Sequence, residues 1–144
     1  MRNSAKLLVC IFVWSSPVFA QSFSPGSIKG LYGIRYSGTV LPTSVFPISG
    51  PITGEGQFKA DGKGNLSGSQ TFDVNGLICL SNFTGTYTVA ADGVCTVTAV
   101  SSAVTSGCPS GTVSLLGVLY DSGKTVQFIQ LDETKVLSGE ARKQ

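Results

Sequence analysis

Aromatic residues at alternating positions of β-prone segments are the side chains in this sequence best suited to binding a ligand. Alternate residues of a strand point to the same face of a sheet, so these side chains are expected to share one interior. There they would line a cavity for a small apolar or amphipathic ligand, or they would pack as an ordinary core. The predicted ligand-binding residues of this kind are Tyr32, Tyr36, Phe58, Phe72, Tyr87 and Phe128.

Gln70 is a polar residue on one of these predicted inward faces, between Leu66 and Phe72. A buried amide must be hydrogen-bonded, or it costs about 1–3 kcal/mol. Gln70 would therefore orient a ligand or bond to a neighbouring tyrosine. A register shift of one residue would instead place it outside.

The residue types present give little indication of a catalytic or metal-binding site. Residues 21–144 contain no histidine, which excludes histidine-based triads, Cys-His dyads and histidine-ligated metal sites. The carboxylates mostly fall in turns or on polar strand faces, with no spacing that indicates two acids facing each other across a cleft. We expect no enzymatic activity, no catalytic residue, no metal and no cofactor.

The first twenty residues have the pattern of a secretory signal peptide. Arg2 and Lys6 precede an apolar run over 7–14, and Ala20 ends a cleavage pattern of small residues. The run is too short to span a membrane, so we expect a secreted or periplasmic protein that is not integral to a membrane. An alternative is a lipoprotein acylated at Cys10.

Residues 21–144 are expected to form one domain that carries almost no net charge. Removing Arg2 and Lys6 from the ten basic residues leaves eight, against eight acidic residues. Because contacts to phosphate dominate affinity for nucleic acids, a chain without a basic patch is not expected to bind them.

Eight segments alternate apolar and polar residues and are bounded by turn residues, which predicts an all-β fold. The clearest signal is a hairpin in which Asp92 and Gly93 join two runs rich in threonine, valine and tyrosine. The predicted strands are 28–38, 52–60, 66–73, 83–89, 94–100, 111–120, 125–131 and 135–142.

The predicted loop lengths favour one topology. Tight turns follow the second, fourth and sixth strands, whereas long loops over 39–51, 75–82 and 101–110 follow the first, third and fifth. Successive connections of an up-and-down barrel lie at opposite poles, so the long loops would share one pole. This pattern predicts an eight-stranded antiparallel up-and-down barrel, with a β-sandwich as the alternative. The first long loop would cover the mouth as a lid or plug the barrel end, through Leu41, Val45 and Phe46.

The same topology makes one cysteine pairing the preferred one. Cys79 and Cys108 would lie in loops at the long-loop pole, whereas Cys95 follows a tight turn at the opposite pole. A disulfide requires Cα atoms within about 7 Å. We therefore expect a Cys79–Cys108 bridge and a free Cys95, with Cys79–Cys95 and no bridge as alternatives.

Three stretches resemble a family of small secreted bacterial proteins of unassigned function. They are G-E-G-Q-F-K-A-D-G-K-G-N-L-S-G at 54–68, T-G-T-Y-T-V-A-A-D-G at 84–93, and the end of the chain with V-Q-F-I-Q and V-L-S-G-E-A-R-K-Q. The resemblance implies a fold and export, but no catalytic residue. The layout is also similar, more distantly, to the calycins (lipocalins and avidins), whose first strand carries Gly-x-Trp where this chain has Gly30-Leu31-Tyr32.

Together these features predict a secreted barrel that binds a small apolar or amphipathic ligand at its long-loop mouth. An eight-stranded barrel has room either for packed side chains or for one small ligand. The alternative is a structural or protein-interaction module of the cell envelope whose barrel is filled.

Overall fold

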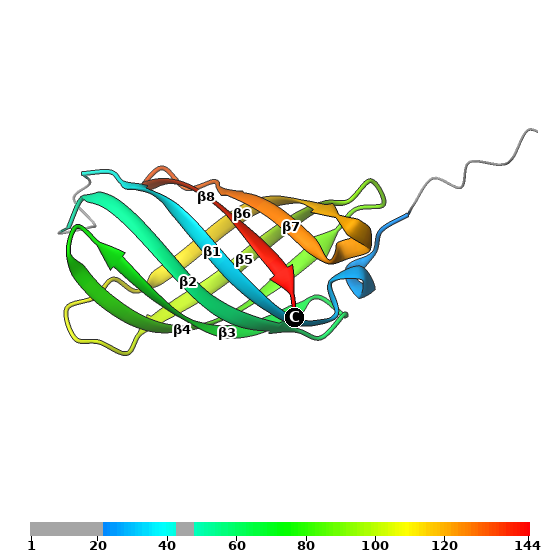
Figure 1. The fold of residues 1–144 in the computed structure, drawn as a ribbon, viewed down its shortest axis with the longest axis horizontal. Helices are drawn as coiled ribbons and strands as arrows, with labels where there is room; N and C mark the ends of the chain where they lie inside the picture. The colour runs from blue at the N-terminus through cyan, green and yellow to red at the C-terminus, as the bar shows by residue number, and fades with distance from the viewer. Residues whose placement is uncertain (1–21, 43–47) are drawn as a thin grey trace, which may run out of the picture.

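A computed structural model describes residues 22–42 and 48–144, which form a closed antiparallel β-barrel (Figure 1). Each strand pairs with the next along the chain, and the last pairs with the first. The up-and-down barrel is thereby confirmed, and the sandwich alternative is wrong. The described strands are β1 (Gly30–Val40), β2 (Gly50–Ala60), β3 (Asn65–Val74), β4 (Leu77–Val89), β5 (Val94–Ala103), β6 (Gly111–Tyr120), β7 (Thr125–Gln130) and β8 (Lys135–Lys143).

Closure rests on the pairing of β1 with β8. The register runs from Tyr32 opposite Lys143 to Val40 opposite Lys135, so the two strands pair along most of their length. Every backbone edge in the described sheet is therefore hydrogen-bonded to a neighbour. Alternate residues then face either the interior or the solvent around the whole barrel.

One pole is closed by two short 3₁₀ helices, η1 (Pro25–Ile28) and η2 (Asp121–Gly123), seen together at the right of Figure 1. The sequence pattern placed Ile28 at the start of the first strand, but it ends η1 and is buried. Pro25 explains the difference, because its fixed φ suits the first turn of a helix. We call this end the closed pole.

The opposite end, the mouth pole, carries the end of β1, the start of β2, the connection over 104–110 and the turn over 131–134. A long loop over 75–82 was predicted here, and that prediction is wrong. Asn75 and Gly76 form a two-residue turn with φ of 50° and 88°, after which the chain immediately re-enters the sheet. The outward Ile78 and Leu80 are apolar and obscure the alternation that would have revealed this strand.

The interior is apolar along its length, in two clusters of buried residues. The cluster at the closed pole includes Ile28, Tyr32 and Tyr87, and the cluster nearer the mouth includes Tyr36 and Phe72. None of the helices among the described residues is long and apolar enough to cross a membrane.

Candidate functional site

A cavity of about 340 Å³ lies inside the barrel. It extends from the buried Ile28 at the closed pole to the exposed Ser110 and Gly111 at the mouth pole. The volume falls in the lower part of the ~300–1,000 Å³ range typical of small-molecule sites. Most of its wall is apolar, including Ile34, Val40, Ile52, Leu66, Val74, Phe83, Val97, Val113, Leu115, Val126 and Leu137.

Six of the seven residues predicted to bind a ligand line this cavity: Tyr36, Phe58, Gln70, Phe72, Tyr87 and Phe128. The seventh, Tyr32, faces inward but is fully buried at the closed pole. Its ring stacks on Phe58 with centroids 5.1 Å apart, and its hydroxyl donates to the carbonyl of Gly123 at 2.6 Å. Tyr32 therefore closes the barrel end and does not line the cavity.

Tyr87 has a similar closing role in addition to its place in the wall. Its hydroxyl accepts a hydrogen bond from the Gly62 N–H at 3.0 Å and donates to the Pro25 carbonyl at 3.0 Å. The phenol thereby joins β4 to η1 and to the β2–β3 turn. These bonds explain how the segment before β1 is held across the closed pole.

Gln70 belongs to a hydrogen-bonded chain across three strands. The Tyr36 hydroxyl donates to Gln70 Oε1 at 3.1 Å, and Gln70 Nε2 donates to Ser81 Oγ at 3.1 Å. Burial raises the pKa of Tyr36, so the phenol stays neutral and acts as the donor. Gln70 thus faces inward and bonds to a neighbouring tyrosine, as one of the two predicted roles required.

Close packing against Gly54 fixes the Tyr36 ring in the position where its hydroxyl reaches Gln70. A Cβ at position 54 would lie 2.4 Å from Tyr36 Cζ and 2.5 Å from its hydroxyl oxygen. A side chain there would displace the phenol from Gln70. The glycine therefore belongs to the site although it carries no functional group.

A polar group at the mouth was missed by the sequence analysis. It comprises Gln130 at the end of β7, Asp132 and Thr134 in the following turn, and Lys135 at the start of β8, all of which line the cavity. The signal was present, because Gln130 continues the inward alternation of Val126 and Phe128.

Within this group, hydrogen bonds organise the turn around the Asp132 carboxylate. It accepts bonds from Gln130 Nε2, from the Thr134 N–H at 3.0 Å and from the Thr134 hydroxyl. Burial lowers the pKa of Lys135, and the nearby Asp132 opposes that shift. The mouth therefore presents an acid and a base close together beside the apolar cavity.

The proposed lid is only partly described. Leu41 is half-buried at the mouth pole, and its N–H donates to the Thr134 carbonyl at 2.8 Å. Val45 and Phe46 lie outside the described residues. The lid therefore stays a prediction.

The Cys79–Cys108 disulfide is confirmed, with Cα atoms 5.7 Å apart. Cys79 was predicted to lie in a loop, but it belongs to β4. It is near the mouth pole, and the disulfide ties the 104–110 connection to the barrel wall. Cys95 is free, buried and part of the cavity wall. Burial raises the pKa of its thiol to about 11, which opposes reactivity as a nucleophile.

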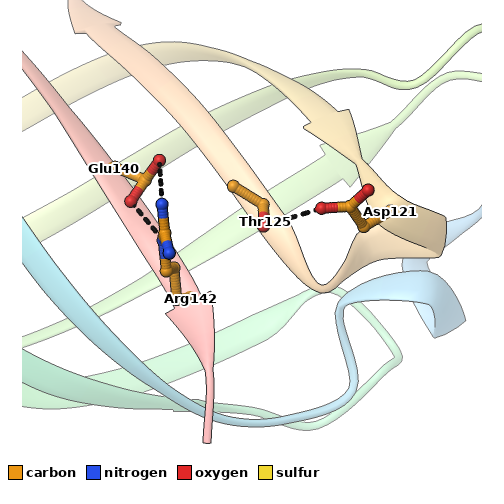
Figure 2. A network of polar contacts seen from close by, with 4 residues as sticks. All are labelled: Asp121, Thr125, Glu140 and Arg142. Atoms are coloured by element: carbon orange, nitrogen blue, oxygen red, sulfur yellow. Dashed lines mark hydrogen bonds and ion pairs between the residues drawn. The ribbon is translucent and has the colours of Figure 1, made fainter.

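Two polar contacts on the outside of the barrel lie away from the cavity. Figure 2 shows Glu140 and Arg142 paired along β8, and Thr125 donating a hydrogen bond to Asp121 near the closed pole. These four residues are exposed or half-exposed and do not line the cavity. Within residues 22–42 and 48–144, no group of three or more histidine, cysteine or acidic residues could hold a metal ion.

Comparison with known proteins finds no family model, no curated protein and no solved structure that matches this chain.

Proposed function

We propose that this protein is a secreted or periplasmic binding protein that holds a small apolar or amphipathic ligand inside its barrel. The observation that carries the proposal is the apolar cavity of about 340 Å³. Side chains can fill the interior of an eight-stranded barrel completely. The cavity is therefore due to the particular inward side chains of this protein and is not required by the fold.

The geometry favours entry of the ligand from one end. At the closed pole, η1, Tyr32 and Tyr87 block the interior through hydrogen bonds to Gly123 and Pro25. At the mouth pole the cavity reaches exposed residues of the 104–110 connection and β6. The apolar part of a ligand would therefore point toward the closed pole, with any polar group at the mouth.

The disulfide supports an extracellular or periplasmic location, because such bonds persist in oxidising compartments. Cleavage of a signal peptide after Ala20 belongs to the same proposal, and residues 1–20 lie outside the described residues. N-terminal sequencing of the exported protein tests it, with Gln21 as the expected first residue.

Native mass spectrometry of the protein purified from its own host tests ligand binding directly. We expect a retained small molecule that is released on unfolding. A second measurement is the binding of N-phenylnaphthylamine, an apolar dye whose fluorescence rises in apolar sites. If nothing is retained and the dye does not bind, the proposal is wrong.

A matched pair of variants localises the binding to the cavity. Val97 is half-buried in the cavity wall, whereas the adjacent Thr98 on β5 is exposed and faces outward. We expect Val97→Trp to weaken dye binding about tenfold or more, because the indole occupies cavity volume. Thr98→Trp should bind as the wild type does. Circular dichroism verifies that both variants remain folded.

A second candidate function, a protein-interaction module, is favoured by the outer surface of the barrel. The strands β4, β5, β6 and β7 contain no charged residue. Apolar side chains are exposed on this face near the mouth, among them Ile78 at 60%, Leu80 at 47% and Val100 at 52%. Exposed apolar patches often mark contacts with other proteins.

Light scattering and pull-down from the host envelope test this second function. We expect Leu80→Asp to abolish self-association and the capture of a partner. Dye binding should be unchanged, because Leu80 does not line the cavity. A wild-type protein that is monomeric and captures no partner would exclude the interaction module.

A further inference from the structure

Gln130 carries a buried hydrogen-bond acceptor that no described residue satisfies. The residue is only 9% exposed and lines the cavity near its mouth. Its Oε1 atom is buried and has no hydrogen-bond partner among the described residues. Because buried polar atoms in native proteins are nearly always paired, this oxygen indicates a partner that is absent from the described chain.

The orientation of the Gln130 amide follows from its neighbour. Nε2 donates to the Asp132 carboxylate, which is itself held by the Thr134 N–H and hydroxyl. An ionised carboxylate only accepts hydrogen bonds, so the reversed amide would place oxygen against oxygen. The amide nitrogen is therefore committed to Asp132, and Oε1 is the atom left to accept from elsewhere.

The other polar chain in the described residues, which reaches the cavity through Tyr36 and Gln70, has no buried side-chain atom without a hydrogen-bond partner. The Tyr36 hydroxyl, the Gln70 amide and the Ser81 hydroxyl bond to one another in sequence. Gln70 Oε1 has its donor, and Gln70 Nε2 has its acceptor. The unsatisfied acceptor at Gln130 therefore places the polar recognition of a ligand at the mouth, beside Asp132 and Lys135.

We propose that the ligand carries an uncharged hydrogen-bond donor, a hydroxyl or an amide N–H, that binds Gln130 Oε1 while its apolar body fills the cavity. This inference rests on the proposed ligand-binding function and specifies the class of ligand. A carboxylate offers only acceptors to Oε1. Asp132 and Lys135 both line the mouth with opposite charges, so together they offer no net attraction for a charged head group of either sign.

Three probes built on a ten-carbon chain and ending in different head groups test the proposal: decanol, decyl methyl ether and decanoate. Decanol can donate a hydrogen bond, whereas the ether and the ionised acid cannot. Their dissociation constants are measured by displacement of N-phenylnaphthylamine at neutral pH. We expect decanol to bind about five- to tenfold more tightly than the ether, as one hydrogen bond to a buried group provides.

Gln130→Met removes the acceptor and keeps a side chain of similar length. We expect this variant to bind the dye normally and to bind decanol and the ether equally well. The matched control is Gln127→Met on the same strand, where the wild-type side chain is exposed and faces outward. This control should keep the wild-type preference for decanol.

The possible results separate this inference from the function on which it rests. Equal binding of decanol and ether by the wild type, or a preference that survives in Gln130→Met, would overturn the role of Gln130. Tighter binding of decanoate would show that a charged head group is selected. If neither the dye nor any probe binds, the proposed ligand-binding function itself fails.

Discussion

The hydroxyl of Tyr32 donates a hydrogen bond to the carbonyl of Gly123 at 2.6 Å, which joins β1 to η2 across 91 residues of sequence. Tyr32 is fully buried, so this bond is shielded from water. It holds the closed pole of the barrel, and the cavity begins beyond it. The contrast between a sealed pole and an accessible mouth depends on this contact and on the bonds of Tyr87.

Tyr32→Phe should therefore lower the stability of the protein and leave the cavity unchanged, because Tyr32 does not line it. The substitution leaves the Gly123 carbonyl without its donor, which costs about 1–3 kcal/mol when the acceptor is buried. The free energy of unfolding is measured by urea denaturation. Tyr120→Phe is the control, because Tyr120 is 46% exposed and its loss should change stability by less than about 0.5 kcal/mol. Equal effects of the two substitutions would contradict the closing role of Tyr32.

The Cys79–Cys108 bridge should contribute substantially to stability. It joins residues 29 apart, and the chain-entropy model assigns about 3–4 kcal/mol to a loop of this length. Cys79→Ala/Cys108→Ala should lower the free energy of unfolding by about that amount. Adding reductant should destabilise the wild type and leave the double variant unchanged. A double variant as stable as the oxidised wild type would refute this expectation.

Cys95 should resist alkylation in the folded protein. Burial raises the pKa of its thiol from 9.0 to about 11, and the thiolate is the nucleophile, so its reactive fraction at pH 8 falls roughly a hundredfold. Mass spectrometry after iodoacetamide treatment measures the rate in native and urea-unfolded protein. The control is Cys95→Ala/Thr96→Cys, which moves the thiol to the adjacent exposed, outward position. Rapid labelling of native Cys95 would show that the cavity wall opens.

The β2–β3 turn should make stability depend on pH in acid. Asp61 accepts bonds from the Asn65 side chain at 2.6 Å, the Asn65 N–H at 2.9 Å and the Lys63 N–H at 2.7 Å, and these lower its pKa to about 2. Because the folded pKa is below the unfolded value of 3.8, the stabilisation is complete above about pH 4. It is lost as the pH falls through about 2.

Asp61→Ala should accordingly unfold at a lower urea concentration than the wild type at pH 7. The difference should shrink between pH 4 and pH 2, where the wild-type carboxylate becomes protonated. Asp61→Asn keeps an acceptor oxygen but does not titrate, so the difference in stability between Asp61→Asn and Asp61→Ala should stay constant over this range. A constant gap between wild type and Asp61→Ala over this range would contradict the assignment.

Most of the fold could be predicted from residue patterns because an antiparallel barrel is built from local features. Alternation identified the strands, and turn residues such as Asp92 and Gly93 identified the hairpins. Cys79 and Cys108 could be paired from loop positions at one pole, although Cys79 belongs to a strand. The loop over 75–82 was predicted wrongly because Ile78 and Leu80 are apolar on the solvent face, where alternation requires polar residues.

The sequence by itself determined which side chains face inward in the strands that alternate apolar and polar residues, because alternation follows from the pleat of the backbone. It left the inward face of 111–120 open, because that strand is apolar on both sides. Only the tertiary structure decided how far along the barrel each one lies, because depth depends on the register between strands and on closure of β8 against β1. Tyr32 and Tyr36 share a face, yet one seals the closed pole and the other lines the cavity. In the same way, alternation placed Gln130 inside, but only the packed barrel left its Oε1 without a donor.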